Sequence, residues 1–223
     1  MLRKIAIAAG LLAAGLVQGA AFAQPTGWNY YNGYTSLPTI PFASGAMSST
    51  NGASVFLQMN GGSPTPFTMD TGSTGIVVSP DYFRPGPNDI NQGPGSVTYT
   101  SSGITYKGTY YQTNVSILQT IQGANNSTTA GAQLATSTVT VLAASQVCGA
   151  DGHCGRITIP IAYMGIGYDR DQMSTIAPAG SKINAFTNIT SLASGASLSG
   201  YRQGYVITNT GITLGLSTEA TQN

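Results

Sequence analysis

A single acidic residue, Asp70, lies between two short apolar segments that favour β-structure. Phe67-Thr68-Met69 precedes it, and Ile76-Val77-Val78 follows the polar sequence Asp70-Thr71-Gly72-Ser73-Thr74. A carboxylate between two buried strands loses its hydration, which is unfavourable unless hydrogen bonds compensate for it. The hydroxyl side chains beside Asp70 can supply such bonds, and Gly72 lets another backbone segment approach closely. The sequence therefore predicts a strand–loop–strand unit that presents a carboxylate with a chemical role.

Much of the remaining chain consists of β-forming segments separated by turn residues. Ser54–Met59 and Phe67–Met69 flank the turn sequence Asn60-Gly61-Gly62, which predicts a hairpin that delivers Asp70. Further strands are expected at Ser96–Tyr99, Ile104–Tyr111, Val115–Gln122, Thr136–Ala144, Ile157–Tyr163 and Gly204–Leu216. This succession favours an all-β fold.

Three other segments have a different character. Pro80–Pro94 contains four prolines and is expected to be a loop, and Gly123–Ala132 is expected to be a polar turn. Ser181–Leu192 has apolar residues at three-residue steps, which predicts one short helix.

The N-terminus has the three parts of a secretory signal. Arg3 and Lys4 are basic, Ile5–Val17 is apolar, and Ala21-Phe22-Ala23 matches a cleavage site, so cleavage is expected after Ala23. The apolar run is shorter than a typical membrane span. We therefore expect a secreted or periplasmic protein of bacterial type that does not associate with membranes.

Charged side chains are few. The whole chain has 8 basic and 7 acidic residues, and removal of the two basic residues in the signal leaves 6 and 7. No basic cluster is present, which argues against nucleic acid or an anionic membrane as a partner. The predicted organisation is a signal peptide at 1–23, an irregular leader at 24–52 and one β domain at 53–223.

Cys148 and Cys154 are the only cysteines, and in an oxidising compartment so close a pair is expected to form a small disulfide loop. The alternative is a zinc site that adds Asp151 and His153. Four ligands so close together in sequence can hardly reach tetrahedral geometry, so no metal is predicted. The sequence has no phosphate loop, haem motif or dinucleotide fingerprint, so no cofactor is predicted either.

The Asp70 motif and its flanks resemble the N-terminal lobe of the pepsin-like aspartic peptidases, in its bacterial form. Val97-Thr98-Tyr99 resembles the strand that carries the family's flap tyrosine. Ala162–Tyr168 resembles the ψ-loop segment that passes the catalytic loop. The resemblance covers roughly residues 53 to 170 in the family's order. It implies a single pepsin-like lobe, with β-sheets in a partly closed barrel and one short helix.

The resemblance also implies roles for individual residues. Asp70 would be a catalytic carboxylate, and Ser73 would hydrogen-bond to it. The active-site loop would be Thr71, Gly72, Ser73 and Thr74; the flap would include Tyr99, Ser102 and Gly103; and the ψ-loop would contain Met164, Gly165, Ile166 and Gly167.

The sequence departs from the family at two places. Members often have a Trp soon after the motif that hydrogen-bonds the flap tyrosine, whereas Ile76-Val77-Val78 stands here and the only Trp is Trp28. The sequence has no second Asp-Thr-Gly or Asp-Ser-Gly. Asn209-Thr210-Gly211 resembles the motif with Asn in place of Asp, although an ordinary strand is the preferred interpretation.

Aspartic peptidases use two carboxylates: one takes a proton from the attacking water, and the other is protonated and polarises the scissile carbonyl. Asp70 supplies one of them, so three interpretations stay open. The chain is the first lobe of a bilobal endopeptidase; or two copies pair and each contributes Asp70; or Asp70 is a relic in a noncatalytic exported module that binds peptides or lies at the cell surface. The first two require a polypeptide substrate.

Overall fold

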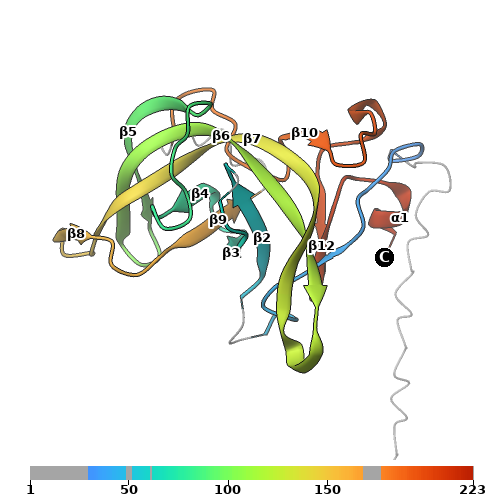
Figure 1. Ribbon diagram of the computed structural model, residues 1–223, viewed down its shortest axis with the longest axis horizontal. Coiled ribbons are helices and arrows are strands. Elements are labelled where there is room, and N and C mark those ends of the chain that lie inside the picture. The colour runs from blue at the N-terminus through green and yellow to red at the C-terminus, as the bar shows by residue number, and fades with distance from the viewer. Residues whose placement is uncertain (1–29, 49–51, 61, 168–176, 223) are drawn as a thin grey trace, which may run out of the picture. The chain divides into compact units, whose positions relative to one another are not determined.

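The computed structural model describes residues 30–48, 52–60, 62–167 and 177–222, and these are built mainly from β-strands (Figure 1). The strands are β1 (Ile40–Pro41), β2 (Ser54–Met59), β3 (Thr65–Asp70), β4 (Thr74–Val78), β5 (Ile90–Tyr99), β6 (Ile104–Gln122), β7 (Thr128–Cys148), β8 (Cys154–Arg156), β9 (Ala162–Ile166), β10 (Ile189–Leu192), β11 (Tyr205–Ile207) and β12 (Gly211–Leu214). The helical turns are η1 (Ala124–Asn126), η2 (Leu198–Gly200) and α1 (Thr218–Thr221). The all-β prediction is confirmed.

Some predictions concern residues outside these ranges. The signal peptide at 1–23, Gly61 of the predicted hairpin turn and Tyr168 at the end of the predicted ψ-loop segment lie there. Within the described ranges, no helix has the length and apolar character needed to cross a membrane.

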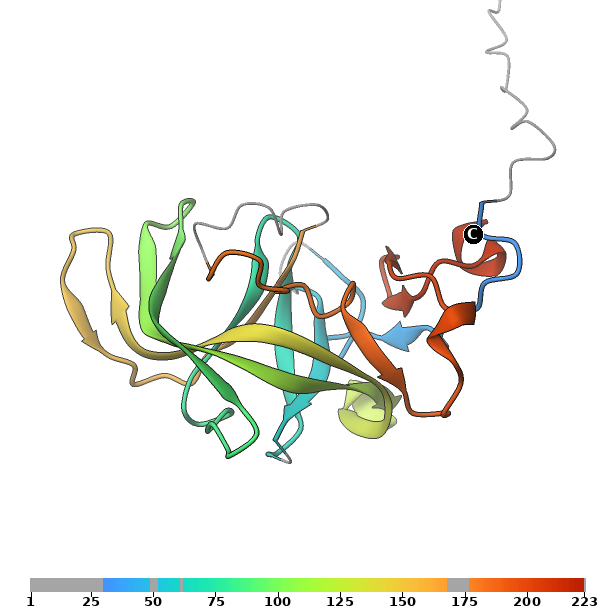
Figure 2. The same cartoon turned by 90° about the horizontal axis from the view of Figure 1, so that it is seen from above.

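Six strands of the larger sheet form a closed ring. Their order is β7–β4–β9–β3–β2–β6, and the ring closes because β6 also pairs with β7 along most of its length. Figure 2 shows β6 and β7 as one long bent hairpin, coloured green to yellow. β5 extends the ring beside β6, and β8 and β10 extend it beside β7. The result is a closed ring of six paired strands with added edge strands.

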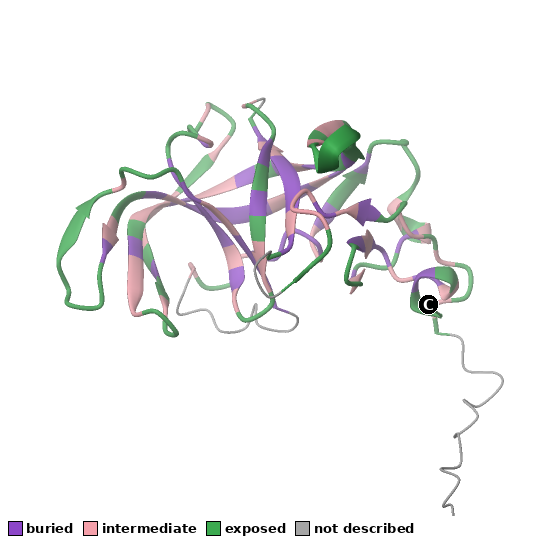
Figure 3. Cartoon of the chain, turned by 90° about the horizontal axis from the view of Figure 1, so that it is seen from below, coloured by how far each residue is buried: buried purple, intermediate pink, exposed green. Residues whose placement is uncertain are grey.

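The interior of the ring is filled by apolar side chains from every one of its strands, and Figure 3 shows the buried segments in purple. Examples that are at most 2% exposed are Leu57, Phe67, Ile76, Val115, Val141 and Met164. Burial of such a side chain stabilises the fold by about 1.5–3 kcal/mol. This core fixes the positions of β3, β4 and β9, which carry the Asp70 motif.

A second sheet of three strands includes part of the predicted leader. β1 pairs with β12, which also pairs with β11. Ile40 and Phe42 are fully buried, and residues Tyr31–Asn223 form one compact unit. Part of the predicted leader is therefore paired and buried.

The helix predicted at Ser181–Leu192 is wrong. The segment forms turns and then β10, which pairs with β7. Ile183, Phe186 and Ile189 are buried, as the three-residue pattern indicated. However, the Asn184 side chain accepts a hydrogen bond from the Phe186 amide at 3.0 Å and donates one to the Ile166 carbonyl at 3.2 Å. Such side-chain bonds compete with helical hydrogen bonding, and here they replace it.

Several predicted strand limits need correction. Ile104–Tyr111 and Val115–Gln122 are parts of the single strand β6, and β7 extends through much of the predicted polar turn at Gly123–Ala132. β5 begins at Ile90, inside the predicted loop Pro80–Pro94. Pro94 is tolerated there because β5 is an edge strand that pairs only with β6.

Two further segments are shorter in strand than predicted. Of the predicted strand Ile157–Tyr163, only the last two residues are strand, and they are the first two residues of β9. The predicted final strand Gly204–Leu216 is a hairpin of β11 and β12, closed by a hydrogen bond from the Thr208 amide to the Gly211 carbonyl at 2.9 Å. Asn209 lies in the turn of this hairpin, so it is not the strand residue that was preferred.

Candidate active site

Asp70 is the last residue of β3, and a three-residue loop connects it to β4. β9 lies between these two strands: it pairs in parallel with β3, where Asp70 is opposite Gly165, and antiparallel with β4, where Gly75 is opposite Gly165. The Gly167 amide also donates a hydrogen bond to the Ser73 carbonyl at 2.7 Å. The predicted ψ-loop segment therefore passes directly beside the Asp70 loop.

Close packing at Gly165 makes this arrangement possible. A Cβ atom at Gly165 would lie 2.5 Å from the carbonyl carbon of Ser73 and 2.5 Å from the Thr74 nitrogen. Real Cβ atoms do not approach backbone atoms this closely, so a residue other than glycine would push β9 away from the loop.

The Asp70 carboxylate is half-buried and held by its own loop. The Gly72 amide donates a hydrogen bond to Oδ1 of Asp70 at 2.7 Å. Thr71 and Gly72 are exposed, while Thr74 is buried at the start of β4. The carboxylate is thus oriented by backbone, and the loop that carries it remains open to another molecule or domain.

Ser73 does not have the role that the resemblance implied. Its Oγ is buried and has no hydrogen-bond partner in the structure. A Cβ atom at Gly165 would lie 2.6 Å from this Oγ, so the hydroxyl is turned towards β9. The predicted hydrogen bond from Ser73 to Asp70 is therefore wrong.

The predicted flap is a hairpin turn between β5 and β6. The amides of Ser102 and Gly103 both donate hydrogen bonds to the Tyr99 carbonyl, at 3.1 and 2.8 Å. Gly103 has φ of +69°, in the left-handed region that favours glycine. Tyr99 is thus the last strand residue before the turn, as predicted.

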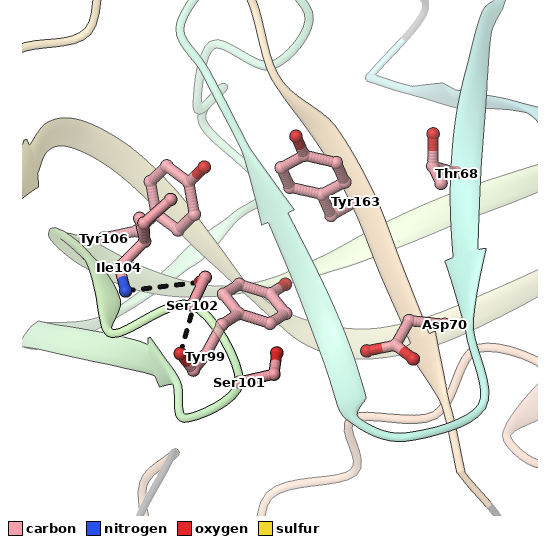
Figure 4. Close-up of a pocket in the computed structure, with 8 residues that line it drawn as sticks. All are labelled: Thr68, Asp70, Tyr99, Ser101, Ser102, Ile104, Tyr106 and Tyr163. Atoms are coloured by element: carbon pink, nitrogen blue, oxygen red, sulfur yellow. Dashed lines mark hydrogen bonds between the residues drawn. The ribbon is translucent and has the colours of Figure 1, made fainter. Parts of the chain in front are cut away.

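A pocket of about 260 Å³ separates Asp70 from this turn. Figure 4 shows its lining: Thr68, Asp70, Tyr99, Ser101, Ser102, Ile104, Tyr106 and Tyr163. The Asp70 carboxylate faces the Tyr99 side of the pocket, and it is the only carboxylate among the described residues that line it. Asp81, Asp89, Asp151 and Glu219, the other described acidic residues, lie elsewhere.

Two tyrosines of the pocket, Tyr99 and Tyr106, have raised pKa values. Burial, and then the negative charge of Asp70, raise the pKa of Tyr99. Burial also raises the pKa of Tyr106, with smaller contributions from the neighbouring Tyr163. Both hydroxyls therefore remain hydrogen-bond donors at neutral and acidic pH.

A scan against protein-family models and a search of curated proteins find no match to this chain. The candidate site therefore rests on its own geometry.

The structure brings together some of the predicted site residues and not others. Asp70, Tyr99 and Ser102 line one pocket, and Gly103 is in the turn beside it. Met164 and Ile166 point into the fully buried core instead, so their part in the site is to hold β9 in place. Tyr106 and Tyr163 were missed as pocket residues. The alternation of side chains along a strand could have indicated Tyr163, which is two residues from Gly165.

The predicted disulfide between Cys148 and Cys154 is confirmed. It closes the turn between β7 and β8, where Nδ1 of His153 lies 3.1 Å from Oδ2 of Asp151 and both side chains are exposed. This turn packs against the flap, since a Cβ atom at Gly103 would lie 2.8 Å from the Cβ of Ala150. Within the described ranges, no group of three or more His, Cys, Asp or Glu side chains is placed to hold a metal ion.

Proposed function

We propose that this chain is a lobe of an aspartic-type endopeptidase, in which Asp70 is one of two carboxylates that activate water for peptide-bond hydrolysis. The observation that carries the proposal is the position of β9 between β3 and β4, which holds the Asp70 loop opposite Tyr99 across a pocket. This is the arrangement implied by the resemblance to the pepsin-like family.

The geometry suits the chemistry in three ways. The Gly72 amide uses one lone pair of Oδ1, so the carboxylate can still accept a proton from water. The neutral hydroxyl of Tyr99 can donate a hydrogen bond to a bound peptide. The rings of Tyr106 and Tyr163 and the side chain of Ile104 offer an apolar surface for a substrate side chain.

The second carboxylate has to come from elsewhere, because a lone carboxyl cannot be ionised and protonated at once. A second lobe or a second copy of this chain is the proposed source, and the exposed Thr71 and Gly72 leave the loop accessible to either. Two carboxyls at close range share one proton, which separates their titrations into the two roles.

We also propose that the protein is exported, with cleavage of the signal after Ala23. The Cys148–Cys154 disulfide supports this, because disulfides persist in oxidising compartments.

A noncatalytic peptide-binding module is the second candidate. It is favoured by one observation: the described residues of the pocket supply a single carboxylate. An apolar pocket of this kind can bind a peptide side chain without hydrolysing the peptide.

The experiment is hydrolysis of an unfolded protein at acidic pH, with and without pepstatin, by the wild type, Asp70→Asn and Asp81→Asn. Asp81 is exposed and lies outside the pocket, so its variant is the matched control. We expect wild-type activity in Asp81→Asn and a loss of at least about a hundredfold in Asp70→Asn. Activity per chain that rises with protein concentration would identify a second copy as the source of the other carboxylate. Equal activity in wild type and Asp70→Asn would refute the proposal. No activity in any variant would exclude a second copy of this chain as the source of the other carboxylate, and would leave a second lobe or the binding module.

A further inference from the structure

Tyr163 connects the strands that hold Asp70 with the flap. It lies on β9, where it is opposite Thr68 of β3 and Val77 of β4. Thr68 and Asp70 are two residues apart on β3, so their side chains lie on the same face, and both line the pocket. The ring of Tyr163 therefore belongs to the same wall of the pocket as the carboxylate.

The same ring contacts two tyrosines of the flap hairpin, and we call Tyr99, Tyr106 and Tyr163 the tyrosine triad. The ring centroids of Tyr163 and Tyr99 are 6.1 Å apart with an interplanar angle of 67°, an edge-to-face contact. Tyr106 lies 6.1 Å from Tyr163 and 5.9 Å from Tyr99. All three separations are within the range of favourable aromatic pairs. Each ring of the triad thus restrains the other two.

The contacts within the triad are between rings. Figure 4 marks no hydrogen bond between Tyr163 and either of the other two tyrosines, and it shows the Tyr163 hydroxyl pointing away from Asp70. The contact between Tyr99 and Tyr163 is therefore one of ring against ring.

Val77, which lies opposite Tyr163, cannot form a hydrogen bond to the flap tyrosine. It stands in the segment where pepsin-like peptidases often carry the Trp that fixes the flap tyrosine, and a valine side chain has no hydrogen-bond donor. Tyr163 is the residue directly opposite Val77 in the β4–β9 register. An aromatic side chain is thus present beside the flap tyrosine, but it comes from the neighbouring strand.

We propose that Tyr163 is a positioning residue whose ring holds Tyr99 over the pocket, opposite Asp70. Its importance for catalysis rests on the proposed function, whereas its effect on Tyr99 can be measured in a chain without activity.

The experiment uses the full chain labelled with fluorotyrosine, with the Tyr99 fluorine resonance assigned by its loss in Tyr99→Phe. Tyr163→Leu removes the ring, Tyr163→Phe keeps the ring and removes the hydroxyl, and Tyr111→Leu removes a ring that packs on Phe83 outside the triad. We expect Tyr163→Leu to move the Tyr99 resonance towards that of free tyrosine. We also expect amide hydrogen exchange at 101–104 to become about threefold to tenfold faster. Tyr163→Phe and Tyr111→Leu should retain the wild-type values.

An unchanged Tyr99 resonance in a folded Tyr163→Leu variant would overturn the proposal, and so would a Tyr163→Phe variant that behaves like Tyr163→Leu. If Tyr163→Leu does not fold, nuclear Overhauser contacts between the Tyr99 and Tyr163 rings in the wild type decide: their presence supports the role and their absence overturns it. In an active chain, Tyr163→Leu should lower kcat/KM mainly through KM, with recovery in Tyr163→Phe. If the chain shows no activity but Tyr99 still responds to Tyr163→Leu, the positioning role is supported and hydrolysis by this chain alone is refuted.

Discussion

The two walls of the Asp70 pocket are held by different interactions. The wall that carries Asp70 is fixed by backbone ladders on both sides of β9 and by contact of Gly165 with the Ser73–Thr74 backbone. The flap hairpin has its own ladders, β5 with β6 and β6 with β7, but it meets the Asp70 wall through the ring contacts of the tyrosine triad. A ring contact contributes only about 0.5–1.5 kcal/mol beyond its buried area. The Asp70 carboxylate is therefore held by backbone on both sides of β9, whereas the flap meets this wall through side-chain contacts.

The largest effect is expected for Gly165→Ala, because Gly165 packs against the loop that follows Asp70. The added Cβ would collide with backbone at 2.5 Å, so β4 and β9 must separate. We expect a loss of about 3 kcal/mol in the free energy of unfolding, measured by urea denaturation.

Gly155→Ala is the matched control, because a Cβ at Gly155 meets nothing within 4 Å. Its effect should stay within about 0.5 kcal/mol. Similar losses in the two variants would show that the wall at β9 is less tightly packed than described.

Removal of the disulfide should loosen the flap wall. Cys148→Ala combined with Cys154→Ala opens a short loop that packs against Gly103, at a cost of about 2 kcal/mol in the free energy of unfolding. Hydrogen exchange by mass spectrometry should become faster at 101–104 and stay unchanged at β3. Faster exchange at β3 and the flap alike would contradict the independence of the two walls.

High pH should also weaken the flap side. Burial raises the pKa of Tyr110 to about 12, and its hydroxyl donates to the Ser96 carbonyl of β5 at 3.1 Å. Because the unfolded chain loses this proton near pH 10, the contribution of Tyr110 is complete below about pH 10 and is lost as the pH rises towards about 12. Tyr110 should therefore account for about 1 kcal/mol of the stability lost by pH 11. Denaturation midpoints measured against pH should fall less steeply in Tyr110→Phe, and identical slopes would contradict this assignment.

The smallest effect is expected for Ser73→Ala. Its buried Oγ has no partner, so removal of the hydroxyl should change the free energy of unfolding by no more than about 0.5 kcal/mol. Ser79→Ala is the contrast, because the buried Ser79 Oγ accepts from the Ile161 amide at 3.2 Å and donates to Asp81. The free energy of unfolding of Ser79→Ala should be lower by about 1–3 kcal/mol. A large loss in the free energy of unfolding of Ser73→Ala would contradict this and would support the predicted hydrogen bond from Ser73 to Asp70.

The wall that carries Asp70 was more predictable from the sequence than the wall formed by the flap. Strand alternation and the turn at Asn60 indicated the hairpin that ends at Asp70, and local patterns of this kind are readable because the residues involved are close in the chain. The triad was not predicted, since Tyr163 meets Tyr99 only after β9 inserts between β3 and β4.

Errors elsewhere have similar causes. The apolar spacing at 181–192 correctly indicated burial, but the hydrogen bonds of Asn184 decided against a helix. The orientation of Ser73 was predicted wrongly because its side chain packs against Gly165, about ninety residues away in sequence. No local sequence pattern indicates such a contact.

The most direct test of the account is a nuclear magnetic resonance titration with an uncleaved peptide that carries apolar side chains, observing the Asp70 carboxyl carbon and the Tyr99 ring. The central claim is that these two groups face one peptide-binding pocket. The account predicts that both signals move along one binding curve, and that Asp70→Asn shifts this curve. Movement of neither signal, or movement confined to the surface around Pro38 and Val206 beside the three-stranded sheet, would contradict it.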